Sequence, residues 1–147
     1  MSPWFYWFAL LGLLAGGAAH AADNACLIES KTEFAASMPA DLLADLKAQY
    51  GDSRECTEGR GLSASELKEM CKGFASAADS LLARMNAKST RKITYLSACP
   101  KPFQGSCDGA NGWPFAGFYY KYSAKDLEAA KKGCAAGSGK WVAGTLK

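Results

Sequence analysis

The feature that most constrains this chain is its set of six cysteines, all of which follow residue 21. An even number of cysteines behind a secretory leader is typical of disulfides formed in an oxidising compartment. We therefore expect a small domain that is stabilised by three disulfides. The cysteines are Cys26, Cys56, Cys71, Cys99, Cys107 and Cys134. No Cys-x-x-Cys or Cys-x-x-Cys-His sequence occurs, so the spacing predicts neither a thioredoxin-type redox site nor covalently attached haem.

The first 21 residues are typical of a secretory signal peptide. An apolar run from Trp4 to Ala15 is followed by small residues that end in Ala19-His20-Ala21, which matches an Ala-x-Ala cleavage site. The alternative is an uncleaved anchor helix, but a membrane span needs about 20 apolar residues and this run is shorter. We expect cleavage after Ala21. A single domain over residues 22–147 would then be left in the periplasm or outside the cell.

The mature chain is expected to contain no histidine, because the only one is His20. Ser-His-Asp and Cys-His catalysis are then excluded, and so are zinc and copper sites that use imidazole ligands. Paired cysteines would remove thiolate metal sites as well. An enzyme of this kind would have to use carboxylates, lysine, tyrosine or a Ser-Lys pair. We expect no metal, no other cofactor, and a protein that binds rather than one that catalyses.

Hydrophobic periodicity and turn residues predict an α+β fold, with N-terminal helices followed by a small β-β-α-β unit. The second of the expected helices begins with a capping box at Ser63 and Glu66. Polar residues 52–62, which include Cys56, are expected to form a loop. The expected helices cover residues 39–50, 64–87 and 124–135, and the expected strands cover 92–98, 116–122 and 140–146.

Several residues between positions 71 and 141 form a recognisable pattern. They are Cys71-Lys-Gly-Phe74, Cys99 and Cys107 with seven residues between them, Phe118-Tyr119-Tyr120, and Cys134 before the Gly-Ser-Gly-Lys sequence that precedes Trp141. This pattern resembles one in small exported bacterial proteins of uncharacterised function. The resemblance implies a Cys107–Cys134 disulfide and no known activity. The other four cysteines are then expected to pair as Cys71–Cys99 and Cys26–Cys56, although six cysteines allow many pairings.

Charge is unevenly distributed along the chain. Residues 22–83 contain 6 basic and 11 acidic side chains, whereas residues 84–147 contain 11 basic and 3 acidic ones. One interpretation is a basic face that binds an anionic partner. The other is that the two halves dock and partly neutralise each other. Arg84, Lys88, Arg91 and Lys92 are expected at a helix C-terminus, where the helix dipole favours cations without any partner.

Aromatic residues concentrate in the second half of the chain, because 8 of the 12 that follow residue 21 lie between positions 103 and 141. Alternation along the strand expected at 116–122 places Phe118, Tyr120 and Tyr122 on one face and the neighbouring residues on the other. Tyr and Trp are favoured at protein interfaces. We predict a binding surface made of Trp113, Phe115, Tyr119 and Lys121. The alternative is that both faces are packed under helices.

These observations favour a small exported binding module, such as an inhibitor, an immunity-type protein or an accessory subunit. Its partner is expected to be another exported protein or a component of the cell envelope. We expect no nucleic acid, and no membrane span after signal cleavage. Two alternatives stay open: a hydrolase of the cell envelope that works without histidine, and a structural envelope protein whose basic face holds an anionic surface.

Overall fold

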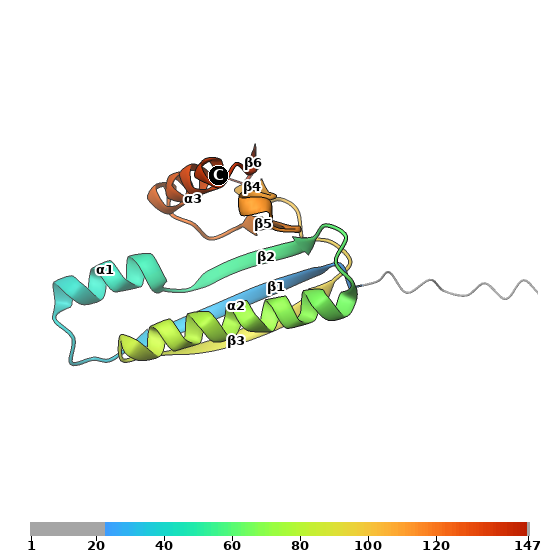
Figure 1. Ribbon diagram of the computed structural model, residues 1–147. Coiled ribbons are helices and arrows are strands. Elements are labelled where there is room, and N and C mark those ends of the chain that lie inside the picture. The colour runs from blue at the N-terminus through green and yellow to red at the C-terminus, as the bar shows by residue number, and fades with distance from the viewer. Residues whose placement is uncertain (1–22, 147) are drawn as a thin grey trace, which may run out of the picture.

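A computed structural model describes residues 23–146 (Figure 1). Within that range the chain forms one six-stranded antiparallel sheet with strand order β3-β1-β2-β5-β4-β6. The strands are β1 (Ala25–Phe34), β2 (Ser53–Gly59), β3 (Ala87–Leu96), β4 (Gly105–Asp108), β5 (Phe115–Tyr119) and β6 (Lys140–Ala143). The helices are α1 (Ala40–Tyr50), α2 (Ala64–Arg84) and α3 (Ala124–Ala136), with a short 3-10 turn, η1 (Ala110–Gly112). The predicted signal peptide lies outside the described residues.

The α+β class is confirmed, but the prediction that helices come first is wrong, because the first described element is β1. Residues 52–62 were expected to form a loop, yet most of them form β2, between β1 and β5 in the sheet. The sequence of β2 is polar, and Cys56, Thr57 and Gly59 are buried because strands flank β2 on both sides. Tertiary pairing therefore creates this strand, which local propensity does not favour.

The three expected helices are all present, and the N-termini of two of them carry side-chain caps. The Ser63 hydroxyl accepts a hydrogen bond from the Glu66 amide, and the Glu66 carboxylate accepts one from the Ser63 amide, which completes the capping box. Ser123 caps α3 through the amide of Asp126. The cation placement needs correction, since α2 ends at Arg84 and β3 begins at Ala87. The later cations of that group, Lys88, Arg91 and Lys92, therefore lie on a strand and not at a helix C-terminus.

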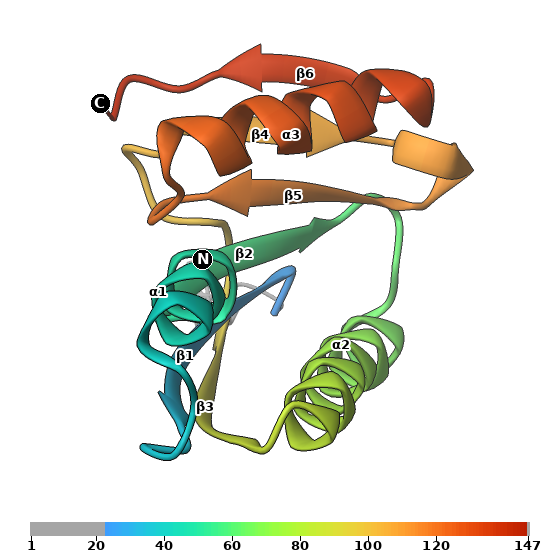
Figure 2. The same cartoon turned by 90° about the vertical axis from the view of Figure 1, so that its left-hand side faces the viewer.

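Two of the three disulfides connect helices to one face of the sheet, which we call the helix side. Cys26 of β1 is bonded to Cys71 of α2, and Cys107 of β4 is bonded to Cys134 of α3. Figure 2 shows α3 lying across β4 and β6, with α2 beside the other end of the sheet. The Cys107–Cys134 prediction is confirmed.

The third disulfide joins Cys56 to Cys99 on the opposite face, so the predicted Cys26–Cys56 and Cys71–Cys99 pairs are wrong. The register of β1 and β2 gives the reason, because Cys56 lies opposite Leu27 and not opposite Cys26. Side chains one residue apart point to opposite faces of a strand. The two cysteines therefore cannot meet, and each belongs to a different buried cluster.

Some of the acidic side chains of the first half of the chain lie opposite basic side chains of the second half within the sheet. Acidic β1 lies between β2 and basic β3, and the register places Glu29 opposite Lys92 and Glu33 opposite Lys88. Arg54 of β2 lies on the other side of Glu29, with Nε 3.5 Å from its Oε1. Opposite charges directly across a pair of strands are favourable. This arrangement supports the interpretation that the two halves of the chain partly neutralise each other.

Candidate functional site

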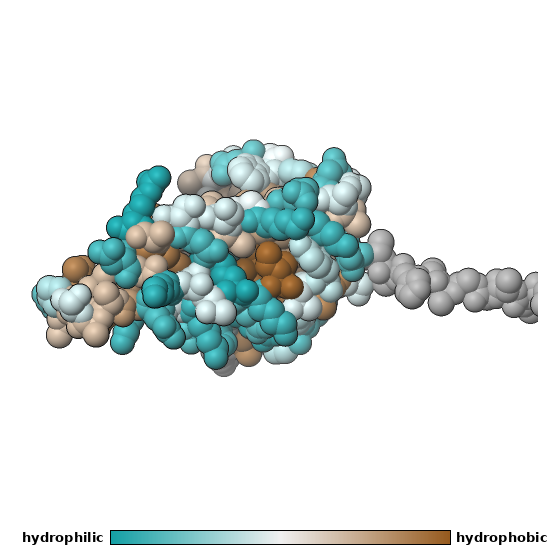
Figure 3. Space-filling view, turned by 90° about the horizontal axis from the view of Figure 1, so that it is seen from below, coloured by the Kyte–Doolittle hydropathy of each residue, from teal (hydrophilic) through white to brown (hydrophobic). Residues whose placement is uncertain are grey.

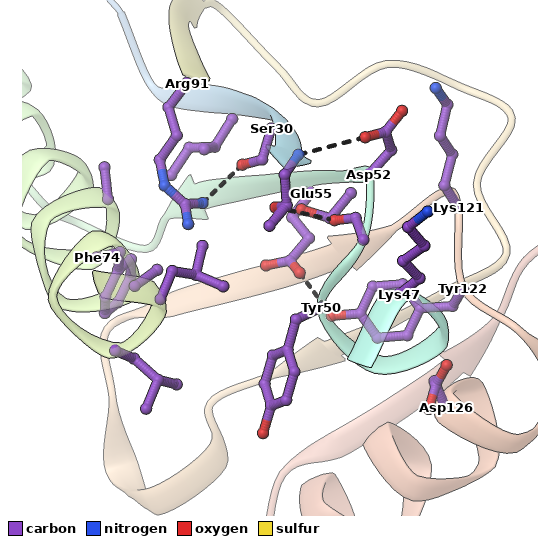
Figure 4. A pocket seen from close by; sticks show the side chains of 18 of the residues that line it. Ser30, Lys47, Tyr50, Asp52, Glu55, Phe74, Arg91, Lys121, Tyr122 and Asp126 are labelled. Atoms are coloured by element: carbon purple, nitrogen blue, oxygen red, sulfur yellow. Dashed lines mark hydrogen bonds between the residues drawn. The ribbon is translucent and has the colours of Figure 1, made fainter. Parts of the chain in front are cut away.

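A cleft of about 410 Å³ opens on the helix side of the sheet, between α1, α2 and α3 (Figure 4). Ligand pockets in proteins commonly fall between about 300 and 1,000 Å³, so the space is large enough for a small ligand or for one or two side chains of a partner. Two of its three helical borders are fixed to the sheet by disulfides, α2 through Cys71 and α3 through Cys134. The third border, α1, carries no cysteine, and none of its residues whose burial is described is buried.

One wall of the cleft is apolar and comes from α2. Its residues recur at three- and four-residue steps, which places them on a single helix face. Leu82 is buried, whereas Leu81 leaves 46% of its surface exposed. The wall residues are Phe74, Ala75, Ala78, Leu81 and Leu82, and Ile28 of β1 adds to it from the floor. This wall supplies apolar surface that no segment of residues 23–146 fully covers.

The remainder of the lining is polar and carries both signs of charge. The strands contribute Ser30, Thr32, Ser53, Glu55 and Arg91, α1 and the residues after it contribute Lys47, Tyr50 and Asp52, and the segment around α3 contributes Lys121, Tyr122 and Asp126. A cleft with one apolar wall and a rim of both charges suits a ligand that has an apolar group and polar or charged ends.

Arg91 links the floor of the cleft to α2. Its Nε donates to Oδ1 of Asp79 at 2.6 Å, and its NH1 donates to the Ser30 hydroxyl at 2.6 Å. The Ser89 hydroxyl also donates to Asp79, and this bond, followed by the effect of Arg91, lowers the pKa of Asp79 below its usual value. Only 13% of the Arg91 side chain is exposed. Arg91 therefore holds α2, β1 and β3 in a fixed relation beneath the cleft.

Glu55 and Tyr122 form a second polar contact in the cleft. The Tyr122 hydroxyl donates to Oε1 of Glu55 at 2.6 Å (Figure 4). Burial, with the Glu55 charge next in size, raises the pKa of Tyr122. The phenol therefore stays protonated and remains a hydrogen-bond donor throughout the physiological range.

The four residues of the predicted binding surface do not form one flat patch, but each lies in the cleft or next to it. Lys121 lines the cleft directly. Trp113 and Phe115 pack on Phe74 of the apolar wall, with ring centroids 6.2 and 5.5 Å away. Tyr119 contacts Tyr122 with ring centroids 4.8 Å apart. The predicted residues therefore border the cleft at two points, through Phe74 and through Tyr122.

The expected position of Tyr122 needs correction. Alternation placed it on the same face as Phe118 and Tyr120, but β5 ends at Tyr119. Beyond that point the alternation no longer applies, and the Tyr122 ring packs on Tyr119 on the helix side. Trp141 of β6 stacks on the same Tyr119 ring at 5.7 Å and 20°. Tyr120 is 5% exposed and donates to the Pro100 carbonyl at 2.8 Å on the opposite face.

Most of the lining, including Glu55, Arg91 and the wall of α2, lies outside the predicted binding surface. The apolar residues of α2 recur along one helix face, but this periodicity does not indicate that its second half stays partly uncovered. Glu55 falls in the segment that was expected to be a loop, and its place in the sheet follows only from the pairing of β2 with β1 and β5.

Within 23–146, no three His, Cys, Asp or Glu side chains are grouped so that they could hold a metal ion. None of the helices in that range is both long enough and apolar enough to cross a membrane.

Titration of the buried phenols predicts that the folded state loses stability at alkaline pH. Burial raises the pKa of Tyr120 to about 12, against the opposing effect of the nearby Arg54. Unfolded tyrosine titrates near pH 10. Above pH 10 the unfolded chain therefore releases protons that the folded chain keeps, and the free energy of unfolding falls as pH rises from about 10 to 12.

Urea unfolding at a series of pH values, with absorbance titration of the phenolates, measures this loss. The variant Tyr120→Phe should show a shallower decline over the same window, because one shifted phenol is gone. An identical decline in the variant would contradict the assignment.

Comparison with protein-family models, with curated proteins and with solved structures finds no match to this chain. The functional argument therefore depends on the geometry of the cleft.

Proposed function

We propose that this protein is an exported, disulfide-stabilised binding module that holds an apolar group of its ligand in the cleft between α1, α2 and α3. The observation that carries the proposal is the partly uncovered apolar wall of α2, opposed by polar side chains of both charges. The disulfides at Cys71 and Cys134 support it, because they hold two of the bordering helices on the sheet before any ligand arrives. Preorganisation of this kind lowers the entropic cost of binding.

The predicted surface residues have a place in this proposal. Lys121 would meet a polar or anionic end of the ligand at the rim. Trp113 leaves 47% of its surface exposed while it stacks on Phe74. It therefore extends the apolar wall toward the outside, where a larger partner would contact it. Exposed aromatic residues beside a pocket are typical anchors of protein interfaces.

The polar contacts inside the cleft favour binding over catalysis. Glu55 accepts from Tyr122, Asp126 accepts from the Ser123 hydroxyl at 2.6 Å, and Asp52 accepts from the Thr32 amide at 3.4 Å. Each of these carboxylates thus has a partner within the protein. These contacts give the three carboxylates structural roles within the protein.

Export is part of the proposal and has its own support. Three disulfides within residues 23–146 are compatible with a secreted or extracellular protein. We infer that residues 1–21 direct the chain to the periplasm or the medium, where another exported protein or an envelope component would be its partner. Intact mass of the protein recovered from the exported fraction tests this inference. A mass that begins at Ala22 and lacks six hydrogens supports it, and a full-length mass with free thiols contradicts it.

The cleft itself is tested with a dye that fluoresces in apolar sites, anilinonaphthalene sulfonate. The substitution Ala78→Trp places an indole against the apolar wall and should weaken dye binding about tenfold or more, because Ala78 lines the cleft. The matched control is Ala77→Trp, since Ala77 is the preceding residue of α2 and is exposed outside the cleft lining. Fluorescence titration gives both affinities.

Urea unfolding of both variants establishes that they are equally folded before their affinities are compared. Equal dye affinity in the two variants would show that the dye does not bind in this cleft, and the proposal would lose its main support. Native mass spectrometry of the exported protein then identifies any bound ligand, whose affinity should depend on Ala78 in the same way.

A further inference from the structure

A second candidate binding surface, besides the cleft, is the unpaired edge of the sheet at β3. All ten residues of β3 pair with β1, and no strand among residues 23–146 pairs with its other side. Ten residues of antiparallel strand extend about 34 Å. Figure 3 views the molecule from below Figure 1, the side toward which α2 and β3 both lie, and shows hydrophilic side chains around a central hydrophobic spot, with a partly hydrophobic left-hand end. A long edge of this kind presents unpaired backbone N–H and C=O groups to an incoming strand.

The charges on β3 limit what that incoming strand can be. Lys88 and Lys92 are both exposed and lie on the same face of the strand, the one opposite the helices. On the side of β3 that is paired with β1, Glu33 lies opposite Lys88 and Glu29 lies opposite Lys92. The spacing of four residues between the two glutamates matches the spacing of the two lysines. The sheet therefore already contains one strand whose charges complement β3.

A second copy of this chain is a poor occupant of the edge. Two antiparallel β3 strands centred on Thr90 would bring Lys88 of one copy opposite Lys92 of the other. Like charges directly across a strand pair are destabilising. Lysines on an edge strand commonly act against such self-pairing. The same lysines favour a strand that carries carboxylates.

We propose that the β3 edge binds an extended acidic segment of a partner protein, which adds as a seventh strand and places two carboxylates, four residues apart, opposite Lys88 and Lys92. Backbone hydrogen bonds supply the affinity in this mode of recognition, and alternate side chains supply the specificity. This surface is separate from the cleft, because the cleft lining contains neither lysine.

The test uses a synthetic peptide with the sequence of residues 28–34, which carries the two glutamates of β1, and a control peptide in which both glutamates are glutamine. Titration of the labelled protein, followed by the amide NMR signals, should show the acidic peptide binding at β3 and the control peptide binding about tenfold more weakly or not at all. High salt should weaken the binding of the acidic peptide, because salt screens exposed charge pairs.

The double variant Lys88→Gln/Lys92→Gln should reduce the affinity for the acidic peptide about tenfold. The control variant is Lys31→Gln, since Lys31 is exposed on the same face but lies on β1, one strand in from the edge. Three results would overturn the proposal: equal affinity for both peptides, perturbed amides that lie away from β3, or equal loss of affinity in the two variants. Self-association that is detected by sedimentation and perturbs the amides of β3 would also overturn it and would make the edge a homodimer contact.

Discussion

Replacement of both Cys26 and Cys71 by alanine should lower the free energy of unfolding by about 4 kcal/mol, the largest effect we expect from any change in this chain. The two cysteines are 45 residues apart in the sequence, and closing a loop of that length removes much conformational entropy from the unfolded chain. Both side chains are also fully buried beside Leu67. Small domains have a total stability of only about 5–15 kcal/mol, so the variant should be close to unfolding at ambient temperature.

Urea unfolding measures the loss, and hydrogen exchange shows where it falls. The amides of α2 should exchange faster in the variant, because the disulfide is the covalent link between α2 and β1. The matched control replaces Cys107 and Cys134. Their disulfide closes a shorter loop of 27 residues and links α3, not α2, to the sheet. That control should leave α2 protected. A loss below about 1 kcal/mol, or faster exchange in α3 rather than in α2, would contradict the expected role of the first disulfide.

The helices of this fold are predictable from local sequence, and the first half of the sheet is not. Ser63 with Glu66, and Ser123 with Asp126, mark helix starts that need no knowledge of the remainder of the chain. In contrast, β1 is buried at Ala25–Leu27 and alternates only in its second half, and β2 is polar. Their strand character comes from pairing with partners that are distant in the sequence, which a local pattern does not reveal.

The disulfide connectivity shows the same limit. The resemblance over residues 71–141 implied Cys107–Cys134, although β4, which carries Cys107, was not among the expected strands. The other two pairs depend on which face of its strand each cysteine occupies. Cys26 and Cys56 differ in face by a single residue of register, so the pairing follows only after the register of β1 and β2 is known.

The candidate site could be predicted in part. The aromatic residues around β5 were singled out because of their type and spacing, and they do border the cleft. The cleft itself exists because α1 covers the apolar wall of α2 only in part: Leu81 of that wall is 46% exposed, and no residue of α1 whose burial is described is buried. Hydrophobic periodicity tells which face of a helix is apolar, but not how much of that face the remainder of the chain covers.

Leu67→Ala should lower the free energy of unfolding by about 3 kcal/mol, because truncation of a fully buried leucine loses its burial and leaves a cavity. Leu67 is 1% exposed and packs with Cys26 and Cys71 in the first half of α2, whereas the cleft lies along the second half. The folded fraction should therefore bind the dye as the wild type does. Leu81→Ala is the matched control on the same helix, since Leu81 is 46% exposed and lines the cleft.

Leu81→Ala should lower the free energy of unfolding by less than about 1 kcal/mol but should weaken dye binding. Leu67→Ala is expected to show the opposite, a large loss of stability with unchanged dye affinity. Urea unfolding and dye titration of both variants separate the two roles. If Leu67→Ala weakened the dye as strongly as Leu81→Ala does, the cleft would depend on the packing of the whole helix, and the separation of a core half from a binding half of α2 would be wrong.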